Sequence, residues 1–244
     1  MSDPIPAPIW HDALSLCRDL QSGSISAQAV MSNVYDRINA LNPTLNALVD
    51  LLPQDQAIAL AVEADAVPIA ARGPLHGLPM APKDAVAVKG FATTWGFPGF
   101  AGNIEPSDDE LARRMRAAGA IFIGHSNMPE FGLGSHTFNE LYGNTYNPYD
   151  LSKTPGGSSG GAAVALAADL LPLADGSDLG GSLRNPASFC NVVGFRPSMG
   201  RMPFNRGFGW FGRMVTTGPM AKNIPDTALM FSIIAGPDRS DPLT

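Results

Sequence analysis

The segment Asp175–Ala187, with the sequence DGSDLGGSLRNPA, limits the possible folds more than any other part of the chain. Two glycines, Gly180 and Gly181, precede Ser182, and a backbone without side chains can approach another group closely. Consecutive N–H groups in such a turn can point at one spot and hold an anion, as acyl transfer to a serine requires. The alternative is a tight turn before a helix that starts near Asn185–Pro186, with Ser182 as a polar turn residue. Both interpretations fit the segment taken alone.

Charge and composition exclude several classes of partner. Sixteen basic residues oppose 22 acidic ones, the net charge is −6 and no basic run occurs, so we expect neither nucleic acid nor an acidic membrane surface as partner. The most apolar run, Gly160–Leu173, is broken by Asp169 and Pro172 and is too short to span a bilayer. The first ten residues do not read as a signal peptide, so we expect a cytoplasmic protein. Cys17 and Cys190 match no metal-ligand spacing; we expect buried thiols, no metal and no cofactor.

Apolar periodicity predicts that helices and strands alternate along the chain. Ser26 is expected to cap the second helix, and Asn42–Pro43 to end it. This alternation favours an α/β sandwich with a largely buried sheet. The expected helices cover residues 10–22, 26–42, 54–66, 109–119, 162–170 and 226–235. The expected strands cover 120–124, 171–174 and 192–195, with a strand region broken by prolines over 76–88 and a strand or extended link over 45–52.

Lys83 lies in an apolar stretch between Met80 and Val86. Burying a charged lysine there is costly, and burial lowers the pKa of an amine, which turns it into a competent general base. The alternative is a lysine that reaches water or pairs with Asp84.

A second glycine-rich segment, GGSSGG, spans residues 156–161. As a phosphate loop it lacks the Lys-Ser/Thr ending. Around Ser159 it matches G-x-S-x-G, but all four histidines precede it, which excludes the chain order of the α/β-hydrolases. Two interpretations stay open: a loop that presents a serine hydroxyl to another loop, and a flexible turn.

The three segments together resemble the amidase signature family in order and spacing: Lys83 in APKD, the GGSSGG loop, and GSDLGGSLRNPA. The similarity extends to flanking residues 72–83, 119–130, 141–147 and 191–199 and covers nearly the whole chain. It implies the amidase-signature fold, a mixed, largely parallel twisted sheet covered by helices on both faces.

The resemblance also implies a Ser–cisSer–Lys triad. Ser182 is then the nucleophile, Ser158 the bridging serine joined to it through an unusual cis peptide, and Lys83 the base. The other implied residues are the backbone N–H groups of the oxyanion hole at Leu179, Gly180, Gly181 and Ser182, the supporting pair Asp178 and Arg184, and the orienting Ser159.

The expected function is that of a serine hydrolase that cleaves an amide-type carbon–nitrogen bond, in a small-molecule carboxamide, anilide or carbamate, or an ester, through an acyl-enzyme on Ser182. Two alternatives are an amidotransferase A subunit, the glutaminase of tRNA-dependent transamidation, and a non-catalytic scaffold of the same fold. Residues 201–220, rich in Phe, Trp and Met, depart from the A-subunit pattern and suggest an apolar substrate wall or a packing surface.

The expected organisation is a single amidase-signature domain over residues 1–244, with N-terminal helices in 1–66 and the catalytic signature core in 67–200. Family members are considerably longer, so we expect the C-terminal half to be absent from this chain. That half is then an expected partner of the chain, and a homodimer stays open.

Overall fold

The computed structural model describes residues 5–203, 214–239, 241 and 243–244, and in them helices alternate with short strands. The α-helices are α1 (Ala13–Ser22), α2 (Ala27–Leu45), α3 (Gln54–Asp65), α4 (Glu110–Ala117), α5 (Gly160–Ala167), α6 (Arg184–Phe189) and α7 (Ile224–Ile234). The strands are β1 (Leu48–Val49), β2 (Pro79–Met80), β3 (Ile121–Phe122), β4 (His125–Ser126), β5 (Phe138–Asn139), β6 (Gly143–Asn144), β7 (Ala174–Asp178), β8 (Val193–Gly194) and β9 (Thr216–Ala221). Three 3-10 turns complete them: η1 (Ile69–Ala71), η2 (Pro98–Phe100) and η3 (Glu130–Gly132).

Capping residues explain where the first helices begin and end. Asp12 accepts a hydrogen bond from the Ser15 amide at 2.7 Å at the start of α1, and Gly23, at φ 80°, ends that helix. Ser26 caps α2 as predicted and accepts from the Ala29 amide at 3.1 Å. The predicted end of α2 is wrong, because Pro43 lies inside the helix. The Asn46 amide still donates to the Asn42 carbonyl at 2.7 Å, so the last turn closes beyond the proline.

The α/β fold is confirmed, but antiparallel pairs outnumber the one parallel pair among the described strands. Only β2 and β3 pair in parallel, whereas β1–β4, β5–β6, β7–β9 and β8–β9 are antiparallel. The expectation of a largely parallel sheet came from the family resemblance and does not describe these strand pairs. Instead β9, which the sequence analysis did not predict, lies between β7 and β8 and runs antiparallel to both.

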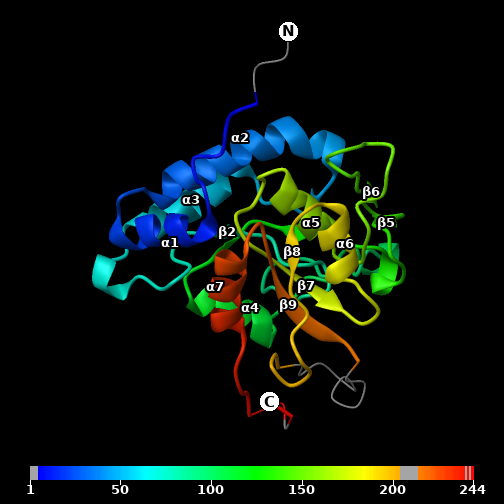
Figure 1. Cartoon of the computed structure of the whole chain (residues 1–244). Coiled ribbons are helices and arrows are strands. Elements are labelled where there is room, and N and C mark those ends of the chain that lie inside the picture. The colour runs from blue at the N-terminus through cyan, green and yellow to red at the C-terminus, as the bar shows by residue number, and fades with distance from the viewer. Residues whose placement is uncertain (1–4, 204–213, 240, 242) are drawn as a thin grey trace.

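Figure 1 shows the N-terminal helices α1 to α3 in the upper left of the molecule, with α4 and α7 below them and β7 and β9 beside α4 and α7. The apolar helix α5 packs against β7, and its residues 160–166 are all buried. The Asp226 carboxylate in α7 accepts hydrogen bonds from the amides of Ala13 and Leu14 at 3.0 and 2.8 Å. The C-terminal helix thereby fastens the first turn of α1.

Cys17 and Cys190 are free and buried, as predicted. None of the helices in the described part of the chain has the length and apolar character needed to cross a membrane. In the same part, no three His, Cys, Asp or Glu side chains lie together as metal ligands would.

Candidate active site

Lys83 is buried beside three serine hydroxyls. It follows β2, pairs with Ser126 in an isolated parallel bridge, and is 1% exposed. Its Nζ donates to Ser158 Oγ at 2.6 Å, to Ser177 Oγ at 3.0 Å and to Ser159 Oγ at 3.1 Å. The alternatives in which Lys83 reaches water or pairs with Asp84 are therefore wrong.

The surroundings of Lys83 favour the neutral amine. Burial lowers the pKa of Lys83 from 10.5 to about 7, although the charges of Asp175 and Asp178 act in the opposite direction. Near neutral pH a large fraction of the side chain is then unprotonated and can accept a proton.

Ser158 and Ser159 lie immediately before α5, where the chain turns sharply. The cis peptide joins Gly157 to Ser158, so it lies within this loop and not between Ser158 and Ser182. A Cβ atom at Gly157 would lie 2.1 Å from the His136 carbonyl oxygen, so only glycine fits there. The Ser159 amide donates to the Ser182 carbonyl at 3.2 Å, which joins this loop to the segment that carries the predicted nucleophile.

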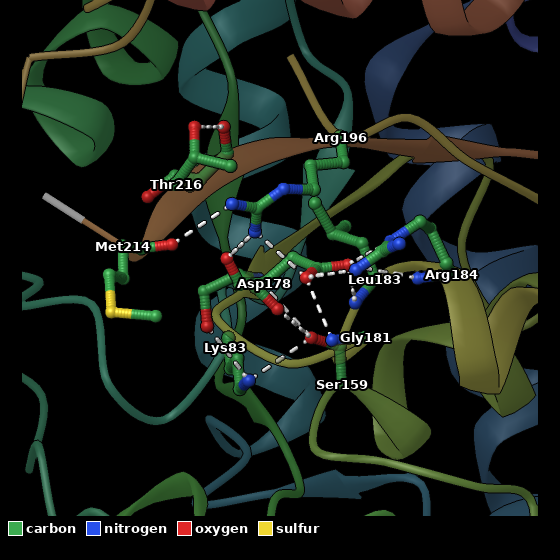
Figure 2. A network of polar contacts seen from close by, with 11 residues as sticks. Lys83, Ser159, Asp178, Gly181, Leu183, Arg184, Arg196, Met214 and Thr216 are labelled. Atoms are coloured by element: carbon green, nitrogen blue, oxygen red, sulfur yellow. Dashed lines mark hydrogen bonds and ion pairs between the residues drawn. The ribbon is translucent and has the colours of Figure 1, made fainter. Parts of the chain in front are cut away.

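Asp178, at the end of β7, holds the loop that leads to Ser182. Its carboxylate accepts from the amides of Gly181 and Leu183 at 2.8 and 3.1 Å and pairs with the guanidinium groups of Arg184 and Arg196 (Figure 2). Burial acts to raise the pKa of Asp178, but the hydrogen bonds from Arg184, Gly181 and Leu183 outweigh it and hold that pKa well below its ordinary value. Asp178 is a permanently charged anchor for the loop.

Ser182 is half-buried and lines a cavity of about 710 Å³ together with Lys83 and Ser158. The structure thus gathers the three predicted catalytic residues at one cavity. Lys83 contacts Ser158 directly, whereas no hydrogen bond between described residues joins the hydroxyls of Ser158 and Ser182.

The predicted oxyanion hole needs one revision. The Gly181 amide already donates to Asp178, which leaves the N–H groups of Leu179, Gly180 and Ser182 as the candidate donors. Gly181 has another role: at φ 123° a Cβ atom would lie 2.6 Å from Asn185 Nδ2, so this tight loop requires glycine.

Three residues of the site, Asp175, Ser177 and Arg196, were not predicted from the sequence. Ser177 contacts Lys83, and Asp175 accepts a hydrogen bond from the Lys83 amide at 3.3 Å. Because alternate residues of a strand face the same side, their spacing in β7 was a usable signal. Arg196 reaches Asp178 from beyond β8, and no local pattern indicates such a contact.

Residues 201–220 were predicted to form an apolar substrate wall or a packing surface. The structure describes only 201–203 and 214–220 of this segment, and 204–213 lie outside the described residues. Pro203 and Val215 both line the cavity.

Several known proteins that are similar to this chain are amidases. The family described as Amidase matches residues 29–244. An acylamidase of Rhodococcus erythropolis is 40% identical over 237 residues, which are 96% of this chain and 50% of that protein. The A subunit of the glutamyl-tRNA(Gln) amidotransferase of Natranaerobius thermophilus is 38% identical over 226 residues, 92% of this chain and 46% of that protein.

Among solved structures, a bacterial aryl acylamidase of the amidase signature family superposes with a TM-score of 0.90 at 32% identity, covering 98% of this chain and 50% of that one. The peptide amidase of Stenotrophomonas maltophilia superposes with a TM-score of 0.87 at 34% identity, covering the same shares. The chain spans about half the length of the relatives that it matches.

Proposed function

The chain belongs to the amidase signature family, and from that premise we propose that it carries the catalytic residues of a serine hydrolase that cleaves amide-type carbon–nitrogen bonds. One observation supports this above all: the Lys83 amine lies 2.6 Å from Ser158 Oγ at a cavity that Ser182 also lines. A buried amine, a relay hydroxyl and an accessible serine are the groups that such a reaction needs.

In the proposed reaction, Ser182 Oγ bonds to the carbonyl carbon and the carbonyl π electrons move to its oxygen. The Ser182 proton passes to Ser158 Oγ while the Ser158 proton passes to Lys83 Nζ, since a hydroxyl both donates and accepts. The carbon–nitrogen bond then breaks, and the Lys83 proton returns through Ser158 to the leaving nitrogen. Water hydrolyses the acyl-enzyme by the same relay.

The N–H groups of Leu179, Gly180 and Ser182 are the proposed donors to the tetrahedral oxyanion. One such donor typically contributes roughly 3–4 kcal/mol to lowering a barrier. Asp178 and Arg184 hold the loop that carries these donors, and Ser159 orients the amine.

The substrates within this proposal are small-molecule carboxamides, anilides, carbamates or esters, because the same acyl-enzyme chemistry serves them all. An amidotransferase A subunit is the second candidate, and the similarity to several such subunits favours it. Glutaminase activity that depends on added partner subunits would support this second candidate.

The proposed partner of the chain is the rest of the same protein, because similar proteins are about twice as long. Three further statements stay predictions: that the chain and the rest of the protein form a single domain, that the protein is a homodimer, and that it is cytoplasmic.

The proposed nucleophile can be tested by labelling the whole protein with a fluorophosphonate and locating the adduct by peptide mass spectrometry. We expect the adduct on Ser182 and none in Ser182→Ala. Ser188→Ala is the matched control, because Ser188 is exposed on α6, and it should label like wild type. An adduct on another serine would refute the assignment. The absence of both labelling and turnover would revive the scaffold alternative.

A further inference from the structure

Two bulky aromatic residues line the cavity from backbone positions that normally suit glycine. Trp95 has φ 55° and Phe131 has φ 52°, and both contribute to the wall of the cavity that contains Ser158 and Ser182. A positive φ is uncommon for residues with large side chains and costs free energy. The surrounding structure must therefore hold both residues in place, and strained residues of this kind cluster at functional sites.

Asp84, the residue after Lys83, holds Trp95. Its buried carboxylate accepts hydrogen bonds from the Thr94 amide at 2.8 Å, from the Gly96 amide at 3.1 Å, and from the Thr94 hydroxyl. The Asp84 carbonyl accepts from the Trp95 amide at 3.0 Å. The turn that presents Trp95 is thus fastened directly to the neighbour of the proposed base.

Phe131 is held by Trp95 and by other aromatic rings. Its amide donates to the Trp95 carbonyl at 2.8 Å, and its ring packs against those of Phe97 and Phe100, with centroids 5.2 and 6.1 Å away. The next residue, Gly132, lies against the proposed relay: a Cβ atom there would be 3.5 Å from Ser158 Oγ. Phe131 is nevertheless 43% exposed, so its ring keeps a free face.

We propose that Trp95 and Phe131 form an aromatic subsite, which takes an aromatic ring of the substrate next to the bond that is cleaved. The proposal rests on the proposed function. Aromatic side chains supply large contact areas with few rotatable bonds, and aromatic pairs gain energy beyond the area that they bury. The neighbouring Met128, Leu133 and Val86 line the same cavity and make this part of its wall apolar. A fixed pair of aromatic residues favours a flat ring over an aliphatic group of equal size.

The test compares phenylacetamide and acetanilide, which carry the ring on the acyl and amine side, with cyclohexylacetamide and N-cyclohexylacetamide. In the whole wild-type protein we expect at least one phenyl compound to have a kcat/KM at least tenfold above its cyclohexyl counterpart. Because aniline leaves more readily than cyclohexylamine, the side is identified by the pair whose ratio falls in Trp95→Leu. In Trp95→Leu this ratio should fall to below threefold, because leucine keeps an apolar wall without the ring. Phe131→Leu should lower it less.

Phe100→Leu is the matched control: Phe100 packs in the same aromatic cluster and is 40% exposed, but it does not line the cavity. Its ratio should stay at the wild-type value. A phenyl-to-cyclohexyl ratio near one in wild type, or an unchanged ratio in Trp95→Leu, would overturn the subsite.

If Trp95→Leu does not fold, wild type provides the deciding measurement. Phenylacetamide or acetanilide should protect Ser182 from fluorophosphonate at concentrations at least tenfold below their cyclohexyl counterparts, and equal protection would overturn the subsite. The outcomes for the two proposals are distinguishable. Loss of Ser182 labelling in wild type refutes the proposed function, whereas normal labelling without ring preference refutes only the subsite.

Discussion

Strand β7 carries two aspartates three positions apart, and their surroundings are opposite. Asp178 accepts from three backbone amides and pairs with two arginines, and its pKa lies well below the ordinary value. Asp175 accepts one hydrogen bond, from the Lys83 amide, and its Oδ1 is buried without a partner among the described residues. Burial raises the pKa of Asp175 to about 7.

The opposite surroundings of Asp175 and Asp178 indicate that the two ends of β7 affect the site in different ways. The Asp178 end is built for geometry, because its charge is fully compensated and holds the loop before Ser182. At the Asp175 end the carboxyl accepts one hydrogen bond, and burial raises its pKa to about 7 while it lowers the pKa of the neighbouring Lys83 to about 7, so the surroundings favour the neutral form of both groups. Variants at the two ends should therefore fail in different ways.

Lys83→Met should have the largest effect on acylation, since it removes the proposed base and keeps the shape. The rate of Ser182 labelling should fall by roughly 10²–10⁴-fold, the usual contribution of general base catalysis. Lys222→Met, which removes a lysine that pairs with Asp169 on the surface, is the control and should label normally. If Lys83→Met labels at the wild-type rate, Lys83 is not the base, and the Asp175 end of β7 does not act on the reaction through it.

The stability of Lys83→Met should also depend differently on pH. A lysine with a pKa of about 7 when folded and 10.5 when unfolded binds fewer protons in the folded state between these values. Its contribution to the free energy of unfolding therefore rises with pH across this window. Urea denaturation from pH 7 to 10 should show this rise in wild type and not in the variant.

Asp178→Asn should be the next most damaging change. Two guanidinium groups lose their charged partner, and the loop amides lose an anionic acceptor, a hydrogen bond to a charged group contributing about 1.5–3 kcal/mol. The melting temperature should fall, and labelling should slow at every pH. The midpoint of its pH profile should move to lower pH by less than in Asp175→Asn, because the Asp178 charge raises the pKa of Lys83 less than the Asp175 charge does. A shifted midpoint with unchanged stability would contradict an anchoring role.

Asp175→Asn should differ from Asp178→Asn in having a smaller loss of rate and a larger change in the pH profile of labelling. The Asp175 charge raises the pKa of Lys83, so its removal should move the labelling midpoint to lower pH. A carboxyl with a pKa raised from 3.8 to about 7 loses stability as pH rises through that window, so the variant should gain stability relative to wild type from pH 4 to 7. Asp226→Asn, another buried aspartate, is the control and should not shift the midpoint.

The smallest effects are expected from the two arginines, and they should differ. The Arg196 side chain is 25% exposed and also donates to the Met214 carbonyl, whereas Arg184 is 56% exposed. Because exposed ion pairs contribute about 0–1 kcal/mol, Arg184→Gln should lower the melting temperature less than Arg196→Gln. If the two variants have equal melting temperatures in thermal scans, the burial of each arginine does not determine how much its ion pair with Asp178 stabilises the fold.

The sequence predicted the parts of the site that depend on local patterns. Two glycine-rich segments and a lysine in an apolar stretch indicated residues that the structure gathers at one cavity, although their catalytic roles stay predictions. The contact of Arg196 with Asp178 joins distant segments and leaves no periodic signal, whereas the two-residue spacing of Asp175 and Ser177 in β7 was a usable one. That the Gly181 amide is occupied by Asp178 follows from the loop geometry and not from composition.

The fold shows the same division. Capping residues and apolar periodicity located the helices, and Ser26 is the clearest case. Strand β9, with the sequence TTGPMA, contains a glycine and a proline and has no alternating apolar pattern. Without β9, the strand order β7–β9–β8 could not be predicted. The end of α2 was misplaced because a proline near the end of a helix removes only one hydrogen bond.

The most direct test of the proposed mechanism is the pH dependence of fluorophosphonate labelling of Ser182, recorded for whole wild-type protein and Lys83→Met in parallel. A neutral Lys83 that acts through Ser158 predicts that the wild-type rate rises with a midpoint of about pH 7 and levels off above it. The variant should stay slow throughout. A wild-type rate that does not change between pH 5 and 9, or a variant that reproduces the wild-type curve, would contradict the proposed mechanism.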